Sequence, residues 1–361
     1  MKRLRTALIG CGKVGGIHAE ALSHSVLSEL VGVCDRDVSR AQQFAAKYGG
    51  GPFSDVAVLL GEARPDAVLI CTPHPLHAEA TVAAARAGAH VLVEKPMAAS
   101  LDDCDRMIEE TRKAGVLLGV VSQRRFYEPV QRMRAAIDAG KIGKPILGVF
   151  QMYSWRDEAY YQSDPWRGTW DGEGGGVLVN QSPHQLDILQ WLMGPIDEIS
   201  GYWGTLNHPS IEVDDTAVAI IRFRSGALGS IIASVSQKPG IYTKVHVHGS
   251  NGASVGVETD HGATFVAGVS SGVPVPPLND LWTIPGEEDL LVKFEAEDRA
   301  LAGERDVMQY YHALQIDEFL TAIIEGREPA VTGEDGRLVV EMVQAIYRSQ
   351  REGRAVKLGR L

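Results

Sequence analysis

Up to about residue 123, short apolar runs alternate with helical segments, and this alternation constrains the fold more than any other feature. The runs are RTALIG, ELVGVCD, DAVLICT, AHVLVEK and GVLLGVVSQ, all rich in Val, Ile and Leu. The segments between them, such as SRAQQFAAKYG and LHAEATVAAARAG, have an Ala-rich helical composition and end on Gly49 and Gly88, which we predict as helix C-caps. The pattern predicts a parallel sheet with helices on both faces.

From Phe126 onward the pattern changes to longer strands joined by tight turns. The segments are KPILGVFQMYSW, ISGYWGTLN, DDTAVAIIRFRSGALGSIIASVS and TKVHVHGSNGASVGV, and they predict a mostly antiparallel sheet. We expect residues 267–290 to form an irregular excursion. HALQIDEFLTAIIEG and GRLVVEMVQAIYRSQREG are predicted to form closing helices.

These two patterns predict an α/β protein of two domains, as expected for a chain of 361 residues. Residues 1–123 would form the parallel-sheet domain. Residues 124–361 would form an α+β domain with a large, mostly antiparallel open sheet. Because an open sheet must hide or blunt its apolar face, we expect that face to be covered by another copy of the chain.

The charge balance excludes several classes of partner. The chain has 46 acidic and 35 basic side chains, and its formal charge of -11 offers no footprint for nucleic acid or an anionic membrane. No stretch approaches the length of a membrane span. The opening MKRLRTALIGCGK places basic residues before an apolar run, but the run is short and breaks at Lys13, so a cytoplasmic protein is the simpler interpretation. We therefore expect a small-molecule partner.

The residue types that commonly bind metal ions show no ligand pattern. The four cysteines lack CxxC spacing, and three lie in or beside apolar strand-like segments, which is typical of buried thiols: Cys11, Cys34, Cys71 and Cys104. His246 and His248 would lie on one face of a strand, but no acidic or thiol residue is near them in the sequence. We predict a structural role for both histidines and no metal site.

In ALIGCGKVGGIHAEAL, a strand runs directly into a glycine-rich turn and then into a helix. The glycines permit a tight turn, close approach of the backbone to a pyrophosphate, and close packing of helix on strand. Asp35 strengthens the pattern because it lies at the end of the second strand. We therefore predict a dinucleotide-binding loop formed by Gly10, Gly12, Lys13, Val14 and Gly15.

Asp35 and Arg36 bear on the choice of cofactor. The Asp35 carboxylate would accept hydrogen bonds from the adenosine ribose hydroxyls and repel a 2′-phosphate, which favours NAD over NADP. Arg36 could instead stack on adenine or reach a 2′-phosphate, and Asp35 could simply form a turn or cap the following helix. We predict NAD as the cofactor, with NADP less favoured.

Lys95 lies where the apolar strand AHVLVEK is ended by Pro96. In open α/β sheets, ligands bind outside the carboxyl ends of the strands, so this strand brings Lys95 to the cofactor edge. Pro96 cannot donate to the sheet, and it restricts Lys95 to an extended conformation. The Lys95 ammonium can stabilise the alkoxide that develops on a sugar hydroxyl during hydride loss. The alternative is a surface salt bridge with Glu94.

A second candidate catalytic segment is GGGVLVNQSPHQLDILQWLMG. Ser182 is predicted to cap a helix, with Pro183 at the first helical position and Gln185 completing a capping box. His184 would then lie in the first turn, where the positive helix end favours the neutral imidazole that can accept a proton. Asp187, one turn later, would favour the charged form. The residues alone leave the net direction open.

Three segments together carry a resemblance to a known family: GxGxxG at residues 10–15, TPHPLHAEATVAAARAGAHVLVEKP at 72–96, and GEGGGVLVNQSPHQLD at 172–187. They resemble the Gfo/Idh/MocA family, named for glucose-fructose oxidoreductase, inositol dehydrogenase and rhizopine catabolism, and the resemblance covers essentially the whole chain. It implies an N-terminal Rossmann domain and a C-terminal α/β domain with an open sheet. It also implies nicotinamide-dependent oxidation or reduction of sugars and cyclitols, by a homodimer or homotetramer.

The resemblance implies roles for individual residues of the second segment. The Asp-x-x-x-His pattern of inositol dehydrogenases maps onto Asn180 and His184, with the histidine as general base. This chain departs from the pattern because Asn180 can hold a sugar hydroxyl or orient the base but supplies no carboxylate charge. Asparagine at this place is associated with nucleotide-sugar uronate dehydrogenases.

The family's Thr-Pro…His element lies near the nicotinamide. Here it corresponds to Thr72, Pro73 and His77, which we group with Glu94 and Lys95 as cofactor-binding candidates. His77, taken as a single residue, is explained equally well by capping or packing.

Arginines alternate with aromatic residues in RRFYEP, SWRDEAYY and DPWRGTW. This composition suits contacts with sugar faces and with phosphate or carboxylate groups. We predict that Trp166 and Arg167 contact the substrate. For Arg124, Arg125 and Arg156, packing in the core or in an interface is an equal alternative.

These observations predict an NAD(P)-dependent oxidoreductase acting on the CH-OH group of a sugar, a cyclitol such as inositol, or a sugar derivative. His184 would accept the hydroxyl proton, Lys95 would stabilise the alkoxide, and Asn180 and Asp187 would orient the partners. One alternative is an NAD-dependent glycosidase that uses transient ring oxidation and elimination. Another is a non-enzymatic nucleotide-binding sensor, although a sensor does not need both Lys95 and His184.

Overall fold

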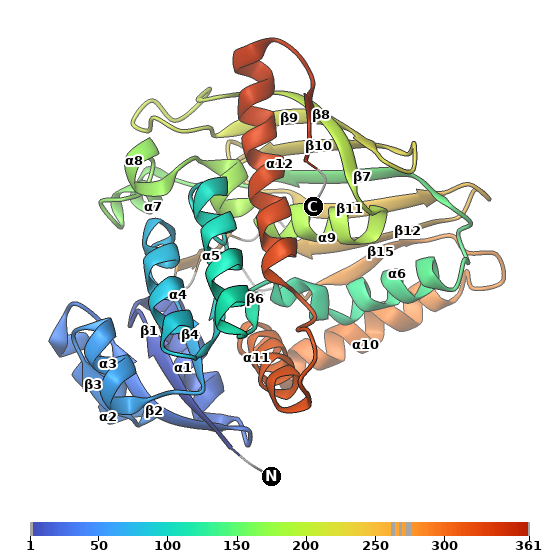
Figure 1. The fold of residues 1–361 in the computed structure, drawn as a ribbon. Helices are drawn as coiled ribbons and strands as arrows, with labels where there is room; N and C mark the ends of the chain where they lie inside the picture. The colour runs from blue at the N-terminus through green and yellow to red at the C-terminus, as the bar shows by residue number, and fades with distance from the viewer. Residues whose placement is uncertain (1–2, 261–263, 267–268, 272–275, 360–361) are drawn as a thin grey trace. The chain divides into compact units, whose positions relative to one another are not determined.

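The structure is a computed structural model that describes residues 3–260, 264–266, 269–271 and 276–359 (Figure 1). The chain forms two compact units. The first unit comprises residues 1–123 and 308–340, and the second comprises residues 124–307 and 341–361. The sequence analysis expected two continuous domains with one boundary after residue 123. The structure differs because residues 308–340 return to the first unit.

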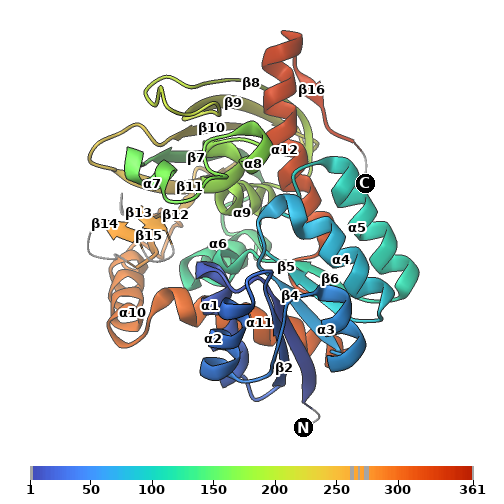
Figure 2. The same cartoon turned by 90° about the vertical axis from the view of Figure 1, so that its left-hand side faces the viewer.

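The first unit contains a parallel sheet whose strand order is β3-β2-β1-β4-β5-β6. This is the order of a doubly wound dinucleotide-binding sheet. Figure 2 shows α1 and α2 on one side of the sheet and α3 and α4 on the other. The elements of the sheet and its helices are β1 (Leu4–Ile9), α1 (Lys13–His24), β2 (Ser28–Cys34), α2 (Val38–Tyr48), β3 (Gly51–Phe53), α3 (Val56–Ala63), β4 (Ala67–Ile70), α4 (His77–Arg86), β5 (His90–Val93), α5 (Leu101–Ala114) and β6 (Leu118–Val120).

Helix α11 (Val307–Glu325) explains why the late segment belongs to the first unit. Its residues Ile316, Phe319 and Leu320 are buried in the same apolar cluster as Leu8 of β1 and Leu92 of β5. Each fully buried apolar side chain of this kind contributes roughly 1.5–3 kcal/mol. The helix therefore completes the core of the parallel-sheet unit, although about 190 residues separate it from β6 in the sequence.

The second unit contains an eight-stranded sheet of order β15-β12-β11-β7-β10-β9-β8-β16, antiparallel except for the β7–β10 pair. Helix α9 packs against β7 and β11, and α6 against β12 and β15. The elements are α6 (Glu128–Asp138), β7 (Pro145–Tyr153), α7 (Glu158–Gln162), α8 (Trp170–Glu173), the π-helical turn η3 (Val177–Gln181), α9 (Pro183–Met193), β8 (Ile196–Gly204), β9 (Thr216–Phe223), β10 (Leu228–Ser234), β11 (Tyr242–Gly249), β12 (Ser254–Asp260), β13 (Thr264–Val266), β14 (Val269–Ser271), β15 (Leu278–Trp282), α10 (Leu290–Glu304) and β16 (Val356–Lys357). Helix α12 (Gly333–Glu352) is divided between the units, with residues 333–340 in the first and 341–352 in the second.

One face of the large sheet carries exposed apolar side chains. Residues of β9 alternate between buried and exposed along the strand, and Val218 and Ile220 lie on the exposed side. Tyr202 of β8, which pairs with Val218, is 76% exposed, and Ile220 is 65% exposed. The predicted α/β fold with a parallel Rossmann sheet and a mostly antiparallel open sheet is confirmed.

The prediction of an irregular excursion over residues 267–290 was wrong for part of that range. Residues 278–282 form β15, which pairs with β12 at the edge of the large sheet, and α10 begins at Leu290. The strand has only five residues, and the prolines and glycines around it led us to predict irregular structure. Residues 267–268 and 272–275 lie outside the described residues.

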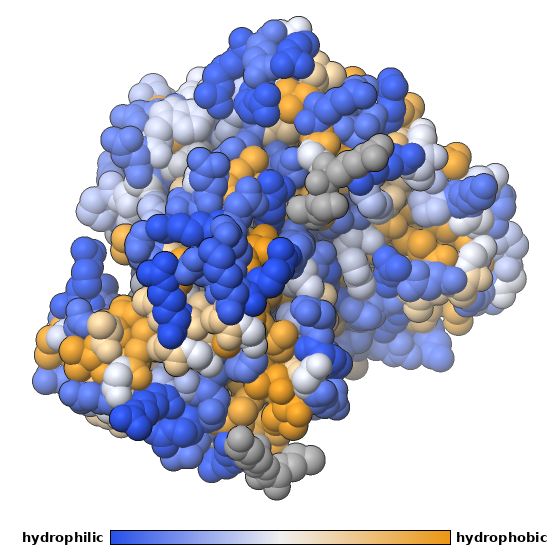
Figure 3. Space-filling view, in the orientation of Figure 1, coloured by the Kyte–Doolittle hydropathy of each residue, from blue (hydrophilic) through white to orange (hydrophobic). Residues whose placement is uncertain are grey.

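The remaining composition-based expectations concern thiols and surface. All four cysteines are free, and three are buried, whereas Cys71 is half-buried. Burial raises the pKa of the Cys11 thiol to about 12, as expected for an inert structural cysteine. Figure 3 shows hydrophilic and hydrophobic residues interspersed on the face in view. In the described part of the chain, no helix has both the length and the apolar character to cross a membrane.

Candidate active site

The glycine-rich turn between β1 and α1 has the geometry of an anion-binding loop. Gly10 has a φ of 103°, and a Cβ atom there would lie 2.6 Å from the carbonyl carbon of Cys71. A Cβ atom on Gly15 would lie 2.1 Å from the Gly10 carbonyl oxygen, so only glycine allows α1 to pack this closely on β1. A Cβ atom on Gly12 would meet nothing within 4 Å. The backbone at Gly12, the N-cap residue of α1, is therefore open to a phosphate.

Asp35 connects this turn to the end of β2. Its Oδ2 accepts a hydrogen bond from the Cys11 backbone N–H at 2.9 Å, and its Oδ1 accepts one from Asp37 N–H at 2.9 Å. The helix cap itself is Asp37, which accepts from Ser39 N–H. Lys13 and Arg36 are exposed, and Val14 is half-buried. The open turn and the acidic residue beyond β2 fit a dinucleotide whose ribose hydroxyls reach Asp35.

Lys95 lies two residues after the end of β5, at the predicted edge of the sheet, and it is half-buried. The preceding Glu94 is buried, and its backbone N–H continues the sheet by donating to the Ile70 carbonyl at 2.9 Å. The Glu94 carboxylate folds back so that Oε2 accepts from the Lys95 backbone N–H at 3.0 Å. Glu94 therefore fixes the backbone that carries Lys95, which the sequence analysis did not foresee.

Two histidines surround the Glu94 carboxylate inside the first unit. His18 of α1 donates from Nε2 to Glu94 Oε1 at 2.7 Å, and the His312 ring of α11 lies edge-on to His18 with ring centroids 5.3 Å apart. Burial opposes ionisation of Glu94, but the His18 hydrogen bond and the charges of His18, His312 and Lys95 outweigh it and lower its pKa to about 2.

The potential ligand atoms of His18, Glu94 and His312 all lie within 4.8 Å of one another. The direct hydrogen bond from His18 to Glu94 accounts for this arrangement without an ion. The cluster links the helix that follows the glycine turn to the end of β5. Sequence reasoning missed it because 76 residues separate His18 from Glu94.

His77 is buried and holds main-chain groups of the same unit. Its Nε2 lies 2.8 Å from the Thr72 carbonyl oxygen, and its Nδ1 lies 3.1 Å and 3.2 Å from the carbonyls of Pro96 and Met97. Burial lowers the pKa of His77, and the three carbonyls oppose that shift. The ring therefore connects the Thr72-Pro73 turn to the segment after Lys95. A direct contact of His77 with cofactor stays a prediction.

In the second unit, Asn180 and His184 lie on either side of the junction between η3 and α9. The predicted helix cap at Ser182 was wrong. Ser182 has helical backbone angles and its Oγ donates to the Val177 carbonyl at 2.8 Å, so it caps nothing. Because η3 runs into α9, His184 does not lie at an open helix end, and the argument from a positive helix terminus does not apply. His184 itself is buried.

Asn180 is held by two side chains. Its Nδ2 donates to Glu173 Oε1 and, at 3.1 Å, to the Tyr160 hydroxyl. Glu173 is buried and its Oε2 accepts from the Gly168 backbone N–H at 2.6 Å. Burial raises the pKa of Glu173, and the hydrogen bonds from Gly168 and Asn180 oppose that rise. Sequence reasoning missed Glu173, although GEGGG in the quoted segment contains it.

Asp187, the third candidate in this segment, pairs with an arginine. Arg125 donates from Nε and Nη2 to the two Asp187 oxygens at 2.7 Å and 2.5 Å. Both side chains are about 4% exposed, so this is a buried two-bond ion pair. Asp187 therefore anchors Arg125, and its predicted role in orienting the reacting groups would act through this pair.

The arginine and aromatic residues gather around one tyrosine. Arg167 donates from Nη1 to the Tyr160 hydroxyl at 2.6 Å and stacks on the Trp166 ring at 4.4 Å. Gln181 also donates to the Tyr160 hydroxyl, at 2.9 Å. Arg167 thus shares the Tyr160 hydroxyl with Asn180, and Trp166 contacts Arg167. A contact of Trp166 or Arg167 with the substrate stays a prediction.

The two strand histidines have protein partners. His246 Nε2 lies 2.9 Å from Asp280 Oδ2, and His248 Nδ1 lies 2.8 Å from Ser254 Oγ. Asp280 also receives Lys244, at 3.0 Å. The predicted structural role for both residues is consistent with these contacts, and the acidic partner came from β15, the strand that the sequence analysis missed.

Comparison with known proteins identifies the family. Residues 4–122 match the "Oxidoreductase family, NAD-binding Rossmann fold", and residues 130–255 match the "GFO/IDH/MocA C-terminal domain". The chain is 31% identical to a myo-inositol 2-dehydrogenase of Thermotoga maritima over 98% of each chain. It belongs to the Gfo/Idh/MocA family. The resemblance inferred from the motifs is therefore confirmed.

Other members of the Gfo/Idh/MocA family extend the comparison. The NAD(+)-dependent scyllo-inositol 2-dehydrogenase of Bacillus subtilis is 29% identical over 99% of this chain and 96% of its own. The WlbA dehydrogenase of Bordetella pertussis, solved in complex with NADH and UDP-GlcNAcA, is 31% identical. Its structure superimposes with a TM-score of 0.87, covering 100% of this chain and 99% of that one.

These findings establish the broad biochemistry. The first unit is an NAD-binding Rossmann domain, and the protein is an oxidoreductase that acts on alcohol groups. It belongs among the sugar and cyclitol dehydrogenases. The predicted NAD cofactor is confirmed. These relatives are named as dehydrogenases, so the alternative of a non-enzymatic sensor is not favoured.

Proposed function

We propose that the protein is an NAD(H)-dependent dehydrogenase that oxidises a secondary ring hydroxyl of a sugar derivative, or reduces the corresponding ketone. The observation that carries the proposal is the arrangement at the start of α9. Asn180 is fixed by Glu173 and Tyr160, and His184 follows four residues later. The amide that replaces the inositol-type aspartate is thus built into a defined hydrogen-bonded site.

His184 acts as the general base that accepts the proton of the reacting hydroxyl. Lys95 donates to the same oxygen and stabilises the negative charge that develops on it. NAD, held by the glycine-rich turn and Asp35, would supply the acceptor for the hydride that leaves the carbinol carbon. Glu94 keeps the Lys95 backbone in place, and Asn180 and Asp187 hold substrate and base in position, directly and through Arg125.

Gly12 leaves the backbone accessible for the pyrophosphate, Gly10 and Gly15 allow the tight turn and the close packing of α1, and Asp35 binds the adenosine ribose. Arg36 is exposed beside Asp35, where it could reach the 2′-phosphate of NADP. The ratio of the affinities for NAD and NADP is therefore the quantity to measure.

Among substrates, we favour a nucleotide-linked sugar over a free inositol. Both the inositol dehydrogenase of T. maritima and WlbA are 31% identical to this chain over nearly full length. Two features of the second unit favour the WlbA-type ligand, UDP-GlcNAcA: asparagine at position 180, and the group of arginines and aromatic residues around Tyr160. A free inositol has no charged substituent for such a group to bind.

We also propose that the open face around Val218 and Ile220 joins copies of the chain into a homodimer or homotetramer. A contiguous apolar face on a sheet is a liability for a monomer because it promotes association. A cytoplasmic location stays a prediction.

The experiment that tests the proposed function is a substrate panel with NAD. Sugars, inositols and nucleotide sugars are incubated with the protein, and NADH absorbance and aglycone release are followed together. Stoichiometric NADH formation with a nucleotide sugar supports the proposal. Aglycone release without accumulating NADH would show the glycosidase reaction instead, and activity confined to inositols would contradict the substrate class. The His184→Ala protein is the control for background reduction.

A further inference from the structure

Four arginines come from the segments that alternate with aromatic residues, and the structure separates them by their partners. Arg124 pairs with Asp260, and Arg125 pairs with Asp187. Arg167 pairs with Asp164 at 3.2 Å. The fourth, Arg156, has a different environment.

Arg156 is buried, with 8% of its surface exposed. Its Nη1 donates to the Trp155 carbonyl at 2.9 Å, its guanidinium lies 5.3 Å from the centre of the Tyr160 ring, and its Nε is buried without a hydrogen-bond partner. Within the ranges that the structure describes, no carboxylate lies within ion-pair distance of it. Residues 261–275 contain neither Asp nor Glu, so that segment supplies no acidic partner either.

Three acidic residues in the surroundings of Arg156 are already engaged with other groups. Asp157 accepts from the Tyr160 backbone N–H as the cap of α7. Asp260 is bonded to Arg124 and Gln185. Asp215 accepts from a run of loop amides and from His208 Nδ1 at 3.0 Å.

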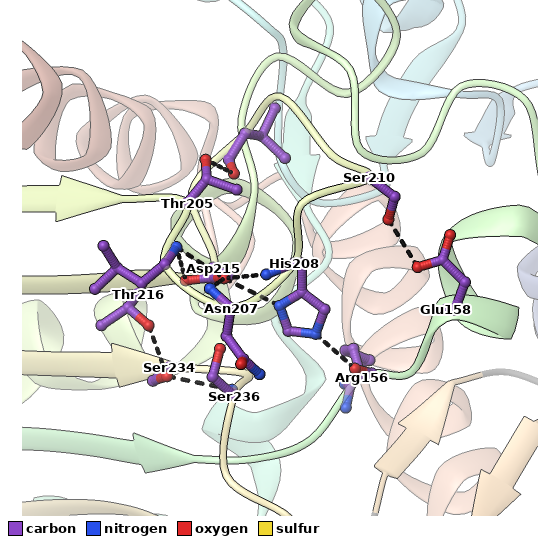
Figure 4. Close-up of polar contacts among 12 residues, drawn as sticks. Arg156, Glu158, Thr205, Asn207, His208, Ser210, Asp215, Thr216, Ser234 and Ser236 are labelled. Carbon is purple, nitrogen blue, oxygen red and sulfur yellow. Dashed lines mark hydrogen bonds and ion pairs between the residues drawn. The ribbon is translucent and has the colours of Figure 1, made fainter.

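The backbone of Arg156 is held rigidly. Its N–H donates to the Val235 carbonyl at 3.1 Å, and its own carbonyl accepts from His208 Nε2 at 2.8 Å. Figure 4 shows the His208 ring between Asp215 and the Arg156 backbone. A network of buried groups therefore positions this arginine, which is the arrangement expected of a preorganised binding residue rather than of a surface side chain.

A buried guanidinium that lacks an anion is costly, because here its lost hydration shell is replaced only by the Trp155 carbonyl and the face of the Tyr160 ring. Burial lowers the pKa of Arg156, and Tyr160, Tyr161 and Asp260 oppose this only in part. A ligand oxyanion that meets Nε and an Nη atom side by side would restore the missing charge and the missing hydrogen bond.

The location of Arg156 says which part of a ligand it would meet. It lies over one face of Tyr160, and the hydroxyl of the same tyrosine receives Asn180 and Arg167. Arg156 is therefore one aromatic side chain away from the residue that we assign to the reacting sugar. A charged group bound there belongs to the sugar or lies next to it.

We propose that Arg156 is a specificity-determining residue that binds a carboxylate carried by the sugar ring of the substrate. This rests on the proposed function, since it names the substrate class of the same site. The substrate is then a sugar acid, and the neutral sugar with a hydroxymethyl group in the same place is a poor ligand because it leaves the guanidinium buried without an anion.

The test is calorimetric binding to the NADH-loaded protein, with two matched ligand pairs: UDP-GlcNAcA against UDP-GlcNAc, and glucuronate against glucose. The wild-type protein should bind the acid of each pair about 10- to 100-fold more tightly. In Arg156→Met this preference should disappear in both pairs, and Arg156→Lys should retain only part of it. Arg348→Met, which changes an exposed arginine of α12 in the same unit, should bind like the wild type.

Three binding results would overturn the assignment. The first is a wild-type protein that does not bind the acids more tightly than the neutral sugars. The second is a preference for the acids that survives in Arg156→Met. The third is a loss of affinity in Arg156→Met that affects only the nucleotide sugars and is equally large for UDP-GlcNAcA and UDP-GlcNAc. The last result would place Arg156 on the diphosphate.

Without ligand, Arg156→Met should melt at or above the wild-type temperature, because it removes a buried charge that has no anion beside it. Strong destabilisation of this variant would contradict the premise. Since binding needs no turnover, Arg156-dependent binding without NAD reduction would sink the proposed function alone.

Discussion

The side-chain amide of Asn180 donates a hydrogen bond to the buried carboxylate of Glu173. With the second bond, to the Tyr160 hydroxyl, both hydrogens of Nδ2 are used and the amide cannot rotate without losing them. The position that is aspartate in inositol dehydrogenases, by the motif, thus faces a carboxylate in this chain. If an aspartate stood at position 180, its carboxylate and that of Glu173 could not both be ionised at this short distance without a large electrostatic cost.

Asn180→Asp should therefore lower activity rather than restore an inositol-type site. The new carboxylate would face Glu173, and the repulsion should reduce kcat/KM by roughly 10- to 100-fold. The double variant Asn180→Asp with Glu173→Gln removes one charge and should recover most of the loss. Initial rates of NADH formation for both single variants and the double variant measure the coupling. Additive effects, or an Asn180→Asp enzyme faster than the wild type, would show that the two side chains act independently.

Asp35 should determine the preference for NAD over NADP. Asp35→Ser removes the charge that repels a 2′-phosphate, so the gap in affinity should narrow or reverse. Asp35→Asn is the matched control, because it keeps an oxygen that can accept from Cys11 N–H and so preserves the turn. Calorimetry with both cofactors gives the affinities. A wild type that prefers NADP by tenfold, about 1.4 kcal/mol, would contradict the assignment.

The free energy of unfolding should depend on pH through the ionisation of Glu94. Its pKa is lowered to about 2 in the folded protein from an ordinary value of 4.5. The unfolded chain therefore takes up the proton first as pH falls, so stabilisation is complete above pH 4.5 and is lost progressively toward pH 2. It amounts to roughly 3 kcal/mol. Urea unfolding of the wild type and Glu94→Gln should give a difference in the free energy of unfolding that is constant above pH 5 and shrinks by up to about that amount as the pH falls toward 2. A difference independent of pH would contradict the lowered pKa of Glu94.

The open face of the large sheet should control assembly. Ile220→Lys places a charge in the centre of the apolar face and should shift the protein toward monomer by the cost of burying that charge. Val292→Lys is the control, because Val292 is 75% exposed on α10, away from that face. Light scattering at micromolar concentration reports the mass of each. A wild type that is strictly monomeric under these conditions would remove the proposed interface.

The parts of the site that sequence predicted are those encoded locally. Gly10 and Gly15 lie within one strand-turn-helix unit, and Lys95 lies at the end of a strand whose apolar run is unmistakable. In a parallel sheet the carboxyl ends of strands share an edge, so local pattern is enough to assign these residues to the cofactor side. The same reasoning gave the parallel-sheet fold.

The parts that sequence missed depend on contacts that no local pattern encodes. His18 and His312 meet Glu94 only after α1, β5 and α11 pack together. Glu173 reaches Asn180 because the chain turns back through consecutive glycines, and a glycine run specifies freedom rather than a direction. The cap at Ser182 failed because a π-helical turn precedes α9, and such turns have no reliable sequence signature.

The central claim is that His184 is the base and Lys95 the group that stabilises the alkoxide. His184→Ala and Lys95→Ala should each lower turnover by about 10² to 10⁴-fold, the usual contribution of a positioned acid-base group or oxyanion donor. NAD affinity should barely change, because neither side chain is assigned to the pyrophosphate or the adenosine ribose. The His184 variant should also regain activity as pH rises and hydroxide replaces the missing base.

The most direct test is therefore the rate of NADH formation by His184→Ala at neutral pH, with a substrate from the panel and NAD at saturation. The account predicts a rate at least about 10²-fold below the wild type, with an unchanged dissociation constant for NAD. A variant with near-normal turnover would contradict it and would assign the base to another residue, with Lys95 and Tyr161 as the next candidates.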